Sequence, residues 1–246
     1  MIDLEENGHQ PFFLDRRLFA GMRVMVPRVL ESEAMETEDE ARDYDEMDHS
    51  EVNARFVNDF LKVHGSCRGG EILDVGTGPG QIPIRLCGVD PRARVLGIDL
   101  SESMLEAAER NVEIAGIKER IRFALGDAKE MTLAEGGYEA VISNSLVHHI
   151  PTPSQVLAEM ARLVAPGGTL MVRDLYRPED QSTIAALVSR YAGGESASAR
   201  SLFEASLNAA LTLEEIQEVV RSLGMSEKDV SMSSDRHWTW IWRRPA

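Results

Sequence analysis

The chain has 246 residues, of which 43% are hydrophobic and 27% charged, a balance typical of a globular protein rather than a disordered or fibrous one. Its formal charge of -15 at pH 7 opposes binding to the phosphate backbone of nucleic acid, so no nucleic-acid partner is predicted. The two cysteines, Cys67 and Cys87, are too few for a disulfide scaffold. Neither the cysteines nor the histidines have the spacing of a zinc site, so no metal is predicted.

The compartment is indicated by the beginning of the chain and by the length of its apolar runs. The first residues, Met-Ile-Asp-Leu-Glu-Glu, are acidic, whereas a signal peptide starts with a basic region followed by an apolar one. No run approaches the roughly 18 consecutive apolar residues of a membrane-spanning helix. The sequence therefore predicts a cytoplasmic protein without stable membrane insertion.

The first 50 residues differ in character from the rest of the chain. Residues 1–30 combine apolar side chains with several arginines, which suits an arm packed over the domain, a homodimer contact or a membrane-surface contact. Between residues 31 and 51 there are eleven acidic residues and one base, Arg42, which indicates a solvated linker or lid. We predict an arm and acidic lid over residues 1–50 and one domain over residues 51–246.

From residue 50 onward, short apolar runs alternate with helical periodicity. Strands are predicted at 72–75, 95–98, 121–125, 140–142 and 170–172, and helices at 50–65, 82–87, 104–115, 156–164 and 179–192. Alternating strands and helices predict an α/β fold, a doubly wound and mostly parallel seven-stranded sheet with helices on both faces.

The last part of the chain has a different pattern. Thr212-Leu-Glu-Glu215 has the form of a capping box that opens a helix, and Gly224 stands where such a helix would end. Two strands are then expected at 229–234 and 238–243. Their connection is too short for a crossover helix, so these strands should form an antiparallel C-terminal hairpin.

A glycine-rich segment joins the first predicted strand to the following helix. Its glycines are Gly76, Gly78 and Gly80. They let the main chain turn sharply and approach a ligand, next to the free N–H groups of a helix N-terminus. Gln81 stands where the dinucleotide fingerprint needs a third glycine, and the P-loop ending is absent. Asp99 ends the next strand beside this loop, where a carboxylate can accept both hydroxyls of a ribose.

Together these motifs resemble the binding region of class I S-adenosylmethionine-dependent methyltransferases that act on small molecules and quinone precursors. The resemblance covers about residues 40–175 and implies S-adenosyl-L-methionine as cofactor. It implies that Asp99 binds the ribose, Asp127 the adenine amino group, and Tyr44 the methionine end. The cofactor residues implied in this way are Tyr44, Asp74, Gly76, Thr77, Gly78, Gly80, Asp99, Leu100, Met104, Gly126, Asp127, Ala128 and Asn144. Asp74 either contacts the cofactor or caps nearby backbone N–H groups, and Tyr44 either closes over the cofactor or belongs to an exposed linker.

Candidates for the reaction itself follow the fourth and fifth strands. The candidate general bases are His148, His149, Asp174 and His237, and histidine suits this role because it titrates near neutral pH. An open α/β sheet holds its ligands at the carboxyl edge, so the acceptor is expected to meet Arg173, Tyr176, Arg236 and His237. Two of these are arginines, which favours an acceptor that carries a carboxylate or a similar anion.

The sequence therefore predicts an enzyme that moves a methyl group from S-adenosylmethionine to a small organic acceptor. The segment Asn144-Ser-Leu-Val lacks the Asn-Pro-Pro-aromatic motif of base and amide N-methyltransferases, and two cysteines do not suit arsenite methylation. The methylated atom is left open. Two alternatives also stay open: a nicotinamide-dependent oxidoreductase of similar fold, and a non-catalytic methyltransferase-like partner subunit.

Overall fold

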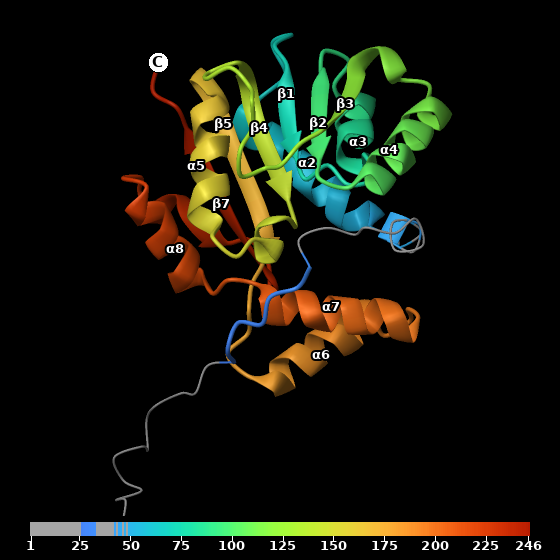
Figure 1. The fold of residues 1–246 in the computed structure, drawn as a ribbon, viewed down its shortest axis with the longest axis vertical. Helices are drawn as coiled ribbons and strands as arrows, with labels where there is room; N and C mark the ends of the chain where they lie inside the picture. Colours follow the sequence, from blue (N-terminus) through green and yellow to red (C-terminus); the bar gives the residue numbers. More distant parts are fainter. Residues whose placement is uncertain (1–25, 33–41, 43, 46, 48) are drawn as a thin grey trace, which may run out of the picture.

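The computed structural model describes residues 26–32, 42, 44, 45, 47 and 49–246, and it confirms the α/β prediction. Seven strands form one sheet in the order β3-β2-β1-β4-β5-β7-β6 (Figure 1). Their bounds are β1 Ile72–Val75, β2 Val95–Asp99, β3 Ile121–Leu125, β4 Tyr138–Asn144, β5 Val164–Leu175, β6 Val230–Met232 and β7 His237–Arg243. Strands β1 to β5 pair in parallel, whereas β7 pairs antiparallel with both β5 and β6, as the predicted hairpin requires.

Helices cover both faces of this sheet (Figure 1). The described helices are α2 Ser50–His64, α3 Gln81–Val89, α4 Glu102–Ala115, α5 Pro153–Leu163, α6 Gln181–Ala192, α7 Ala197–Ala209 and α8 Leu213–Ser222. Short 3-10 turns are η1 Lys118–Arg120, η2 Val147–His149 and η3 Glu227–Asp229. None of the helices in the described part of the chain is long and apolar enough to span a membrane.

Two apolar cores arise because successive strand residues point to opposite faces of the sheet. Leu73 and Val75 of β1 pack in the core beneath α5 and α8, whereas Ile72 packs in the core beneath α2, α3 and α4. Every residue of β1 is buried, as expected for a central parallel strand covered on both sides. The two cores fix the positions of the strand ends, which carry the site.

Local signals near the C-terminus are confirmed. Thr212 Oγ1 accepts from the Glu215 backbone N–H, and the Glu215 carboxylate accepts from the Thr212 N–H, which completes the capping box. Gly224 has a φ of 76° just past the end of α8, the left-handed conformation that favours glycine at this position. These caps fix where α8 begins and ends, and α8 in turn buries Ile216 and Val220 against the sheet.

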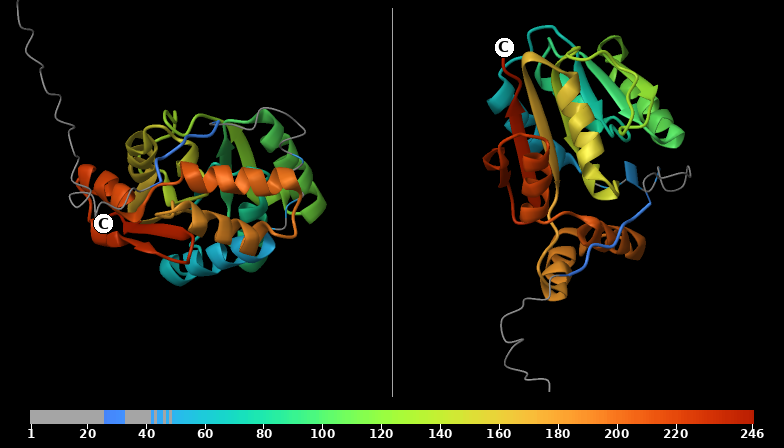
Figure 2. Two further views of the ribbon diagram at one scale, coloured as in Figure 1. Left: turned by 90° about the horizontal axis from the view of Figure 1, so that it is seen from below. Right: turned by 60° about the vertical axis from the view of Figure 1, so that its left-hand side comes forward.

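Helices α6 and α7 lie side by side across the carboxyl edge of the parallel strands (Figures 1 and 2). The sequence analysis predicts α6 near 179–192 but does not predict α7. The sequence signals of α7 are Ser196, whose side chain caps the Ala199 N–H, and an apolar series at 199, 202, 203 and 207 with helical spacing. Leu207 packs with Ile184, Leu187 and Val26 in a third apolar cluster. This pair of helices forms a cap over the edge where an α/β sheet binds its ligands.

Candidate functional site

The loop between β1 and α3 turns beneath the cavity through three glycines with positive φ. Gly76, Gly78 and Gly80 have φ values of 72°, 53° and 75°, in the region where other residues are strained. A Cβ at Gly76 would lie 2.9 Å from Leu146, and one at Gly80 would lie 2.9 Å from Phe123, whereas one at Gly78 would meet no atom within 4 Å. Gly78 therefore keeps open the space in front of the loop.

Asp99, at the end of β2, holds this loop in place. Its carboxylate accepts from the Gly78 N–H at 2.8 Å and from the Ser101 N–H at 3.0 Å. Burial raises the pKa of Asp99, and the backbone hydrogen bonds only partly oppose the shift. Asp99 still lines the cavity, so its remaining lone pairs can accept hydrogen bonds from a ligand.

Asp74 lies below the loop rather than on the cavity wall. It is buried and accepts from Thr77 Oγ1 at 2.8 Å. Burial raises its pKa to about 7, although the Thr77 hydrogen bond acts in the opposite direction. Of the two interpretations of Asp74, this contact favours the local cap, made to a side chain rather than to a backbone N–H.

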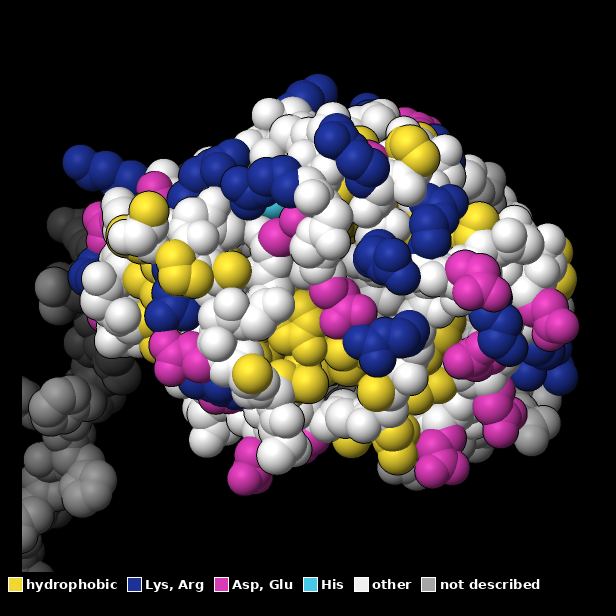
Figure 3. Space-filling model, turned by 90° about the horizontal axis from the view of Figure 1, so that it is seen from above, with side chains coloured by type: hydrophobic (Ala, Val, Ile, Leu, Met, Phe, Trp, Pro, Cys, Tyr) yellow, Lys and Arg dark blue, Asp and Glu magenta, His cyan; other side chains and the backbone are white. Residues whose placement is uncertain are grey.

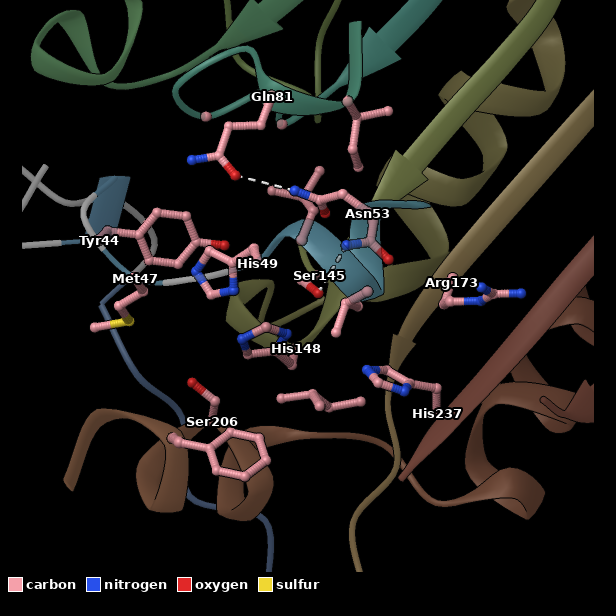
Figure 4. A pocket seen from close by; sticks show the side chains of 18 of the residues that line it. Tyr44, Met47, His49, Asn53, Gln81, Ser145, His148, Arg173, Ser206 and His237 are labelled. Atoms are coloured by element: carbon pink, nitrogen blue, oxygen red, sulfur yellow. Dashed lines mark hydrogen bonds between the residues drawn. The ribbon is translucent and has the colours of Figure 1, made fainter. Parts of the chain in front are cut away.

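A cavity of about 580 Å³ opens at the carboxyl edge (Figure 4), within the range of small-molecule sites. It brings together many of the residues that the sequence singled out: Tyr44, Gly76, Thr77, Gly78, Asp99, Met104, Asn144, His148, His149, Arg173, Arg236 and His237. A small hollow beside it is lined by Gly76, Asp99, Leu100, Gly126, Asp127 and Ala128. Outside both lie Asp74, Gly80, Asp174 and Tyr176.

The small hollow lies between the end of β2 and the segment that follows β3. Leu100, just after β2, leaves 43% of its surface exposed. Asp127 accepts from the Lys129 N–H at 2.9 Å and lies 3.1 Å from its ammonium group. Burial raises the pKa of Asp127, but these Lys129 contacts outweigh it and the net pKa is lowered. The carboxylate therefore stays ionised and able to accept from an amino group.

Tyr44 reaches the cavity because its neighbour Asp45 is anchored. The Asp45 carboxylate accepts from Gln81 Nε2 and from Asn111 Nδ2, both at 3.0 Å. Gln81 Oε1 accepts in turn from Asn53 Nδ2 at 3.0 Å (Figure 4). Burial, together with the charges of Asp99 and Asp174, raises the pKa of Tyr44 to about 12. Gln81, which breaks the dinucleotide fingerprint, thus has a structural role at the cavity wall.

His148 and Asp174 form a buried pair. His148 Nδ1 lies 2.6 Å from Asp174 Oδ1, and the His148 backbone N–H donates to Asp174 Oδ2 at 3.1 Å. Burial lowers the pKa of His148, but the Asp174 carboxylate outweighs it and the net pKa is raised. Burial raises the pKa of Asp174, but the charge of His148 and the hydrogen bonds to the carboxylate outweigh it, so the net pKa is lowered. Because Asp174 holds Nδ1, the other ring nitrogen of His148 is left for the cavity.

The adjacent histidine does not point the opposite way, as alternation on a strand would require. The two residues lie in the 3-10 turn η2, and their ring centroids are 4.1 Å apart with a 37° tilt. His149 Nδ1 lies 2.9 Å from the Ser32 carbonyl oxygen, so it donates to that oxygen. Burial and the neighbouring His148 lower the pKa of His149 to about 4, which keeps this ring neutral at pH 7.

The two arginines proposed for an anionic acceptor already have carboxylate partners. Arg173 is buried, with Nη2 at 3.0 Å from Asp59 Oδ2 and Nε donating to Thr239 at 2.8 Å. Arg236 pairs with Asp235 at 3.3 Å and lies 3.3 Å over the Tyr191 ring. Asp59 also pairs with Lys62 at 2.8 Å, and Asp235 with Arg190 at 3.2 Å, so each carboxylate is shared by two basic side chains.

The other two acceptor candidates differ in their surroundings. His237 lines the cavity, with Nδ1 2.8 Å from Ser234 Oγ. Burial and the charge of Arg236 lower its pKa to about 3, so the ring is neutral. Tyr176 instead forms a bridge to Leu211 and packs against the α5 and α8 core, away from the cavity.

Several cavity residues were missed from the sequence. Cap residues that face the cavity are Tyr191, Ala199, Leu202, Phe203 and Ser206. The N-terminal segment 26–32 also packs beside the site, with Arg28 donating to the backbone oxygens of Ala209, His148 and Ile150 at 2.7, 3.1 and 3.0 Å. The helical spacing of α7 could have indicated the first group. Nothing in the local sequence marks the contacts of Arg28, because its partners lie more than 100 positions away.

The cavity has unsatisfied polar groups where a ligand would bind. Asn144 Oδ1, at the end of β4, is buried without a hydrogen-bond partner in the described part of the chain, which is costly unless a ligand or water donates to it. Together with the open space at Gly78 and the cavity-facing carboxylate of Asp99, this acceptor fits the polar groups of S-adenosylmethionine, a nucleoside joined to an amino acid.

Comparison with known proteins agrees with this geometry. The model of the methyltransferase domain family matches residues 67–221. Methyltransferase GfsG of Streptomyces halstedii is 34% identical over 126 residues, 51% of this chain and 45% of that protein. The 27-O-demethylrifamycin SV methyltransferase of Amycolatopsis mediterranei is 30% identical over 176 residues, 70% of this chain and 60% of that protein. The match thus spans about half of these relatives' length.

The fold comparison points the same way. A putative S-adenosyl-L-methionine-dependent methyltransferase from Methanococcus maripaludis superposes with a TM-score of 0.67 and 18% identity, covering 89% of this chain and 98% of that one. Such low identity supports the fold alone. The family match, which covers more than half of the chain, shows more: the chain belongs to the methyltransferase domain family, among the class I S-adenosylmethionine-dependent methyltransferases.

Proposed function

We propose that this protein transfers a methyl group from S-adenosylmethionine to a hydroxyl group of a small, largely apolar acceptor bound beneath α6 and α7. The observation that carries the proposal is His148, in the wall of the same cavity as the glycine loop, with Asp174 behind it at 2.6 Å. It supports a proton acceptor and a nucleoside site that share one cavity.

The donor side of the cavity is formed by the ends of β1, β2 and β4. The glycine loop approaches the ligand without side chains, Asp99 accepts from the ribose hydroxyls, and Asn144 Oδ1 accepts from a polar group of the amino-acid part. Tyr44 presents a neutral ring over the cavity, and an aromatic face attracts a cation such as a sulfonium. The small hollow at Leu100 and Asp127 receives the adenine.

The chemistry requires positioning more than reactive groups. S-adenosylmethionine, when bound, supplies an activated methyl group for in-line displacement. The chain holds the acceptor oxygen in line, which can contribute about 7–11 kcal/mol, and His148 accepts the hydroxyl proton through the ring nitrogen that Asp174 does not hold. Asp174 keeps the ring oriented and stabilises its charged form, so it acts as a positioning residue.

The shape and charge of the acceptor side indicate the substrate class. Leu175, Leu202 and Phe203 give it an apolar wall, with Ser206 as a polar group. Arg173 contacts Asp59, which Lys62 shares, and Arg236 contacts Asp235, which Arg190 shares. An uncharged molecule with a hydroxyl group fits the apolar wall without displacing these contacts. The rifamycin relative, whose name specifies a demethylated oxygen as its methylation site, is consistent with an oxygen acceptor.

The test is a screen of hydroxylated apolar compounds with methyl-labelled S-adenosylmethionine. We expect His148→Ala to lower kcat by roughly 10²- to 10⁴-fold, the usual contribution of a general base, while the affinity for S-adenosylmethionine stays within about twofold. The control is Glu106→Gln, at an exposed position on α4. The proposal fails if the wild type methylates no hydroxyl compound, or if His148→Ala retains full kcat on the compound identified.

A further inference from the structure

The N-terminal segment 26–32 brings a carboxylate to the histidine pair. Glu31 Oε2 lies 3.7 Å from His149 Nδ1, and Glu31, His148 and His149 each offer a ligand atom, all within 4.8 Å of one another. Their side chains are 12%, 4% and 18% exposed. From this arrangement we infer that Glu31, His148 and His149 form a binding site for a divalent transition metal such as Zn²⁺, and that metal bound there inhibits the enzyme.

The donor set is that of a metal site. Two imidazoles and one carboxylate suit zinc and its first-row neighbours, whereas Mg²⁺ and Ca²⁺ prefer all-oxygen ligands. Ligand atoms around tetrahedral zinc lie about 3.4 Å apart, from bond lengths near 2.1 Å. The three ligand atoms, now within 4.8 Å of one another, thus need to close by up to about 1.4 Å around the ion, which requires side-chain movement on a 3-10 turn and an extended segment.

A second observation points to a missing partner. Glu31 Oε1 is buried and has no hydrogen-bond partner in the described part of the chain, although the carboxylate also interacts with the Ser206 side chain. A buried carboxylate oxygen without a partner is costly. A cation between Glu31 and the histidines removes this cost.

One contact at the histidines matches those of known metal centres. His148 Nδ1 is held by Asp174, which leaves the second ring nitrogen as a ligand, and a carboxylate in this position orients a metal-binding histidine and strengthens it. His149 Nδ1 lies 2.9 Å from the Ser32 carbonyl oxygen and 3.7 Å from Glu31 Oε2, so a metal bound at this nitrogen would replace its hydrogen bond to Ser32. Ser32 and Glu31 both belong to the N-terminal segment, so a bound metal would tie this segment to η2.

The inhibitory effect rests on the proposed function, because a metal on His148 blocks the nitrogen that accepts the acceptor's proton. Metal binding itself does not rest on it. The two are therefore tested separately, first by binding to the full-length protein without cofactor or acceptor, then by activity.

Binding is measured with the chelator-treated full-length protein, by equilibrium dialysis with Zn²⁺ and by the visible spectrum of added Co²⁺. We expect one equivalent of Zn²⁺ and the intense bands of four-coordinate Co²⁺ in the wild type. Glu31→Gln and His149→Gln should each weaken binding at least tenfold, and circular dichroism confirms that both variants are folded. The matched control is Glu195→Gln, an exposed acid at the cavity rim, which should bind like the wild type.

The inference is overturned if the wild type shows no saturable binding, or if Glu31→Gln and Glu195→Gln bind Zn²⁺ equally well. In the activity assay, Zn²⁺ should inhibit the wild type and the Glu195→Gln variant but not Glu31→Gln at the same concentration. Binding without inhibition would refute the inhibitory effect alone. Binding in a protein that methylates no hydroxyl compound would refute the proposed function and leave the metal site standing.

Discussion

Three aspartates at or near the carboxyl ends of the parallel strands β1, β2 and β5 have three different environments. Asp74 is buried and holds Thr77, Asp99 holds the Gly78 N–H and still faces the cavity, and Asp174 holds His148. The same side chain therefore serves as a structural bond, a ligand acceptor and a partner for a base. Spacing along the chain places all three at one sheet edge, but only the packed structure distinguishes their partners.

The role of Asp99 leads to a binding prediction. In Asp99→Asn the amide oxygen can still accept from the Gly78 N–H, so the loop stays in place, but the charged acceptor for the ribose hydroxyls is lost. Hydrogen bonds to charged groups contribute about 1.5–3 kcal/mol, so the affinity for S-adenosylmethionine should fall roughly 10- to 150-fold. Isothermal titration calorimetry measures it, with Glu106→Gln as control. Unchanged affinity in Asp99→Asn would remove the ribose assignment.

The pair of His148 and Asp174 predicts how activity depends on pH. The pKa of His148 is raised above its ordinary 6.5, so the pair's contribution to stability is complete below pH 6.5 and is lost as the pH rises through the raised pKa. The neutral base forms over that same interval, so kcat should rise there. Asp174→Asn removes the charge that raises the pKa of His148, while burial still lowers this pKa. The rise in kcat should therefore move to lower pH, and the maximal kcat should fall. An identical pH profile in the two proteins would contradict the role of Asp174.

At the scale of elements, local signals were sufficient where the contacts are local. The capping box of α8, the glycine loop and the strand alternation are encoded within a few residues, and each is confirmed. The turn at Tyr44 and Asp45 and the segment 26–32 depend on partners far away in the chain, namely Asn111 for Asp45 and Ala209 for Arg28. Periodicity carries no information about such contacts. The prediction of a lid over 31–50 falls largely on residues outside the described part of the chain and stays a prediction.

The segment 26–32 carries the prediction that belongs to this scale. Arg28 joins η2 to the end of α7 through three backbone carbonyls, so Arg28→Ala should lower the free energy of unfolding by about 1.5–3 kcal/mol. It should also speed amide exchange in α7. Arg28→Lys should restore only part of the loss, because an ammonium lacks the planar fork of a guanidinium.

Urea unfolding and hydrogen exchange by mass spectrometry test the role of Arg28. The control is Arg200→Ala, since Arg200 also lies on the cap but donates to the nearby Glu195 carbonyl, within a single helical region. If exchange in α7 is the same in Arg28→Ala and in the wild type, the segment does not hold the cap.

At the scale of the whole molecule, the two edges of the sheet differ in chemistry. The carboxyl edge carries the cavity, and α6 and α7 lie across this edge with the segment 26–32 packed against α7 (Figure 2). Lysine and arginine side chains gather on the face at the amino ends of the strands (Figure 3), although the chain has a formal charge of -15. The sequence predicts a doubly wound sheet, whose strand order reverses between β1 and β4. It does not predict the cap over the cavity, because α7 is not among the predicted helices.

Because residues of the sheet edge, of α6 and α7 and of 44–55 line one cavity, ligand binding should stabilise the molecule as a unit. At about 100 times its dissociation constant, S-adenosylhomocysteine should add about 2.7 kcal/mol, which raises the Tm of a protein of this size by roughly 5–11 °C. NAD should produce no rise in Tm.

Gly78→Val should abolish the rise in Tm with S-adenosylhomocysteine, since the valine side chain enters the open space before the loop. Gly116→Val is the matched control, because Gly116 has a similar φ of 68° and also meets nothing within 4 Å but lies outside both hollows. Both variants should lose about 1–2 kcal/mol from backbone strain. A rise with NAD, or equal rises in the two variants with S-adenosylhomocysteine, would show that the glycine loop does not hold this ligand.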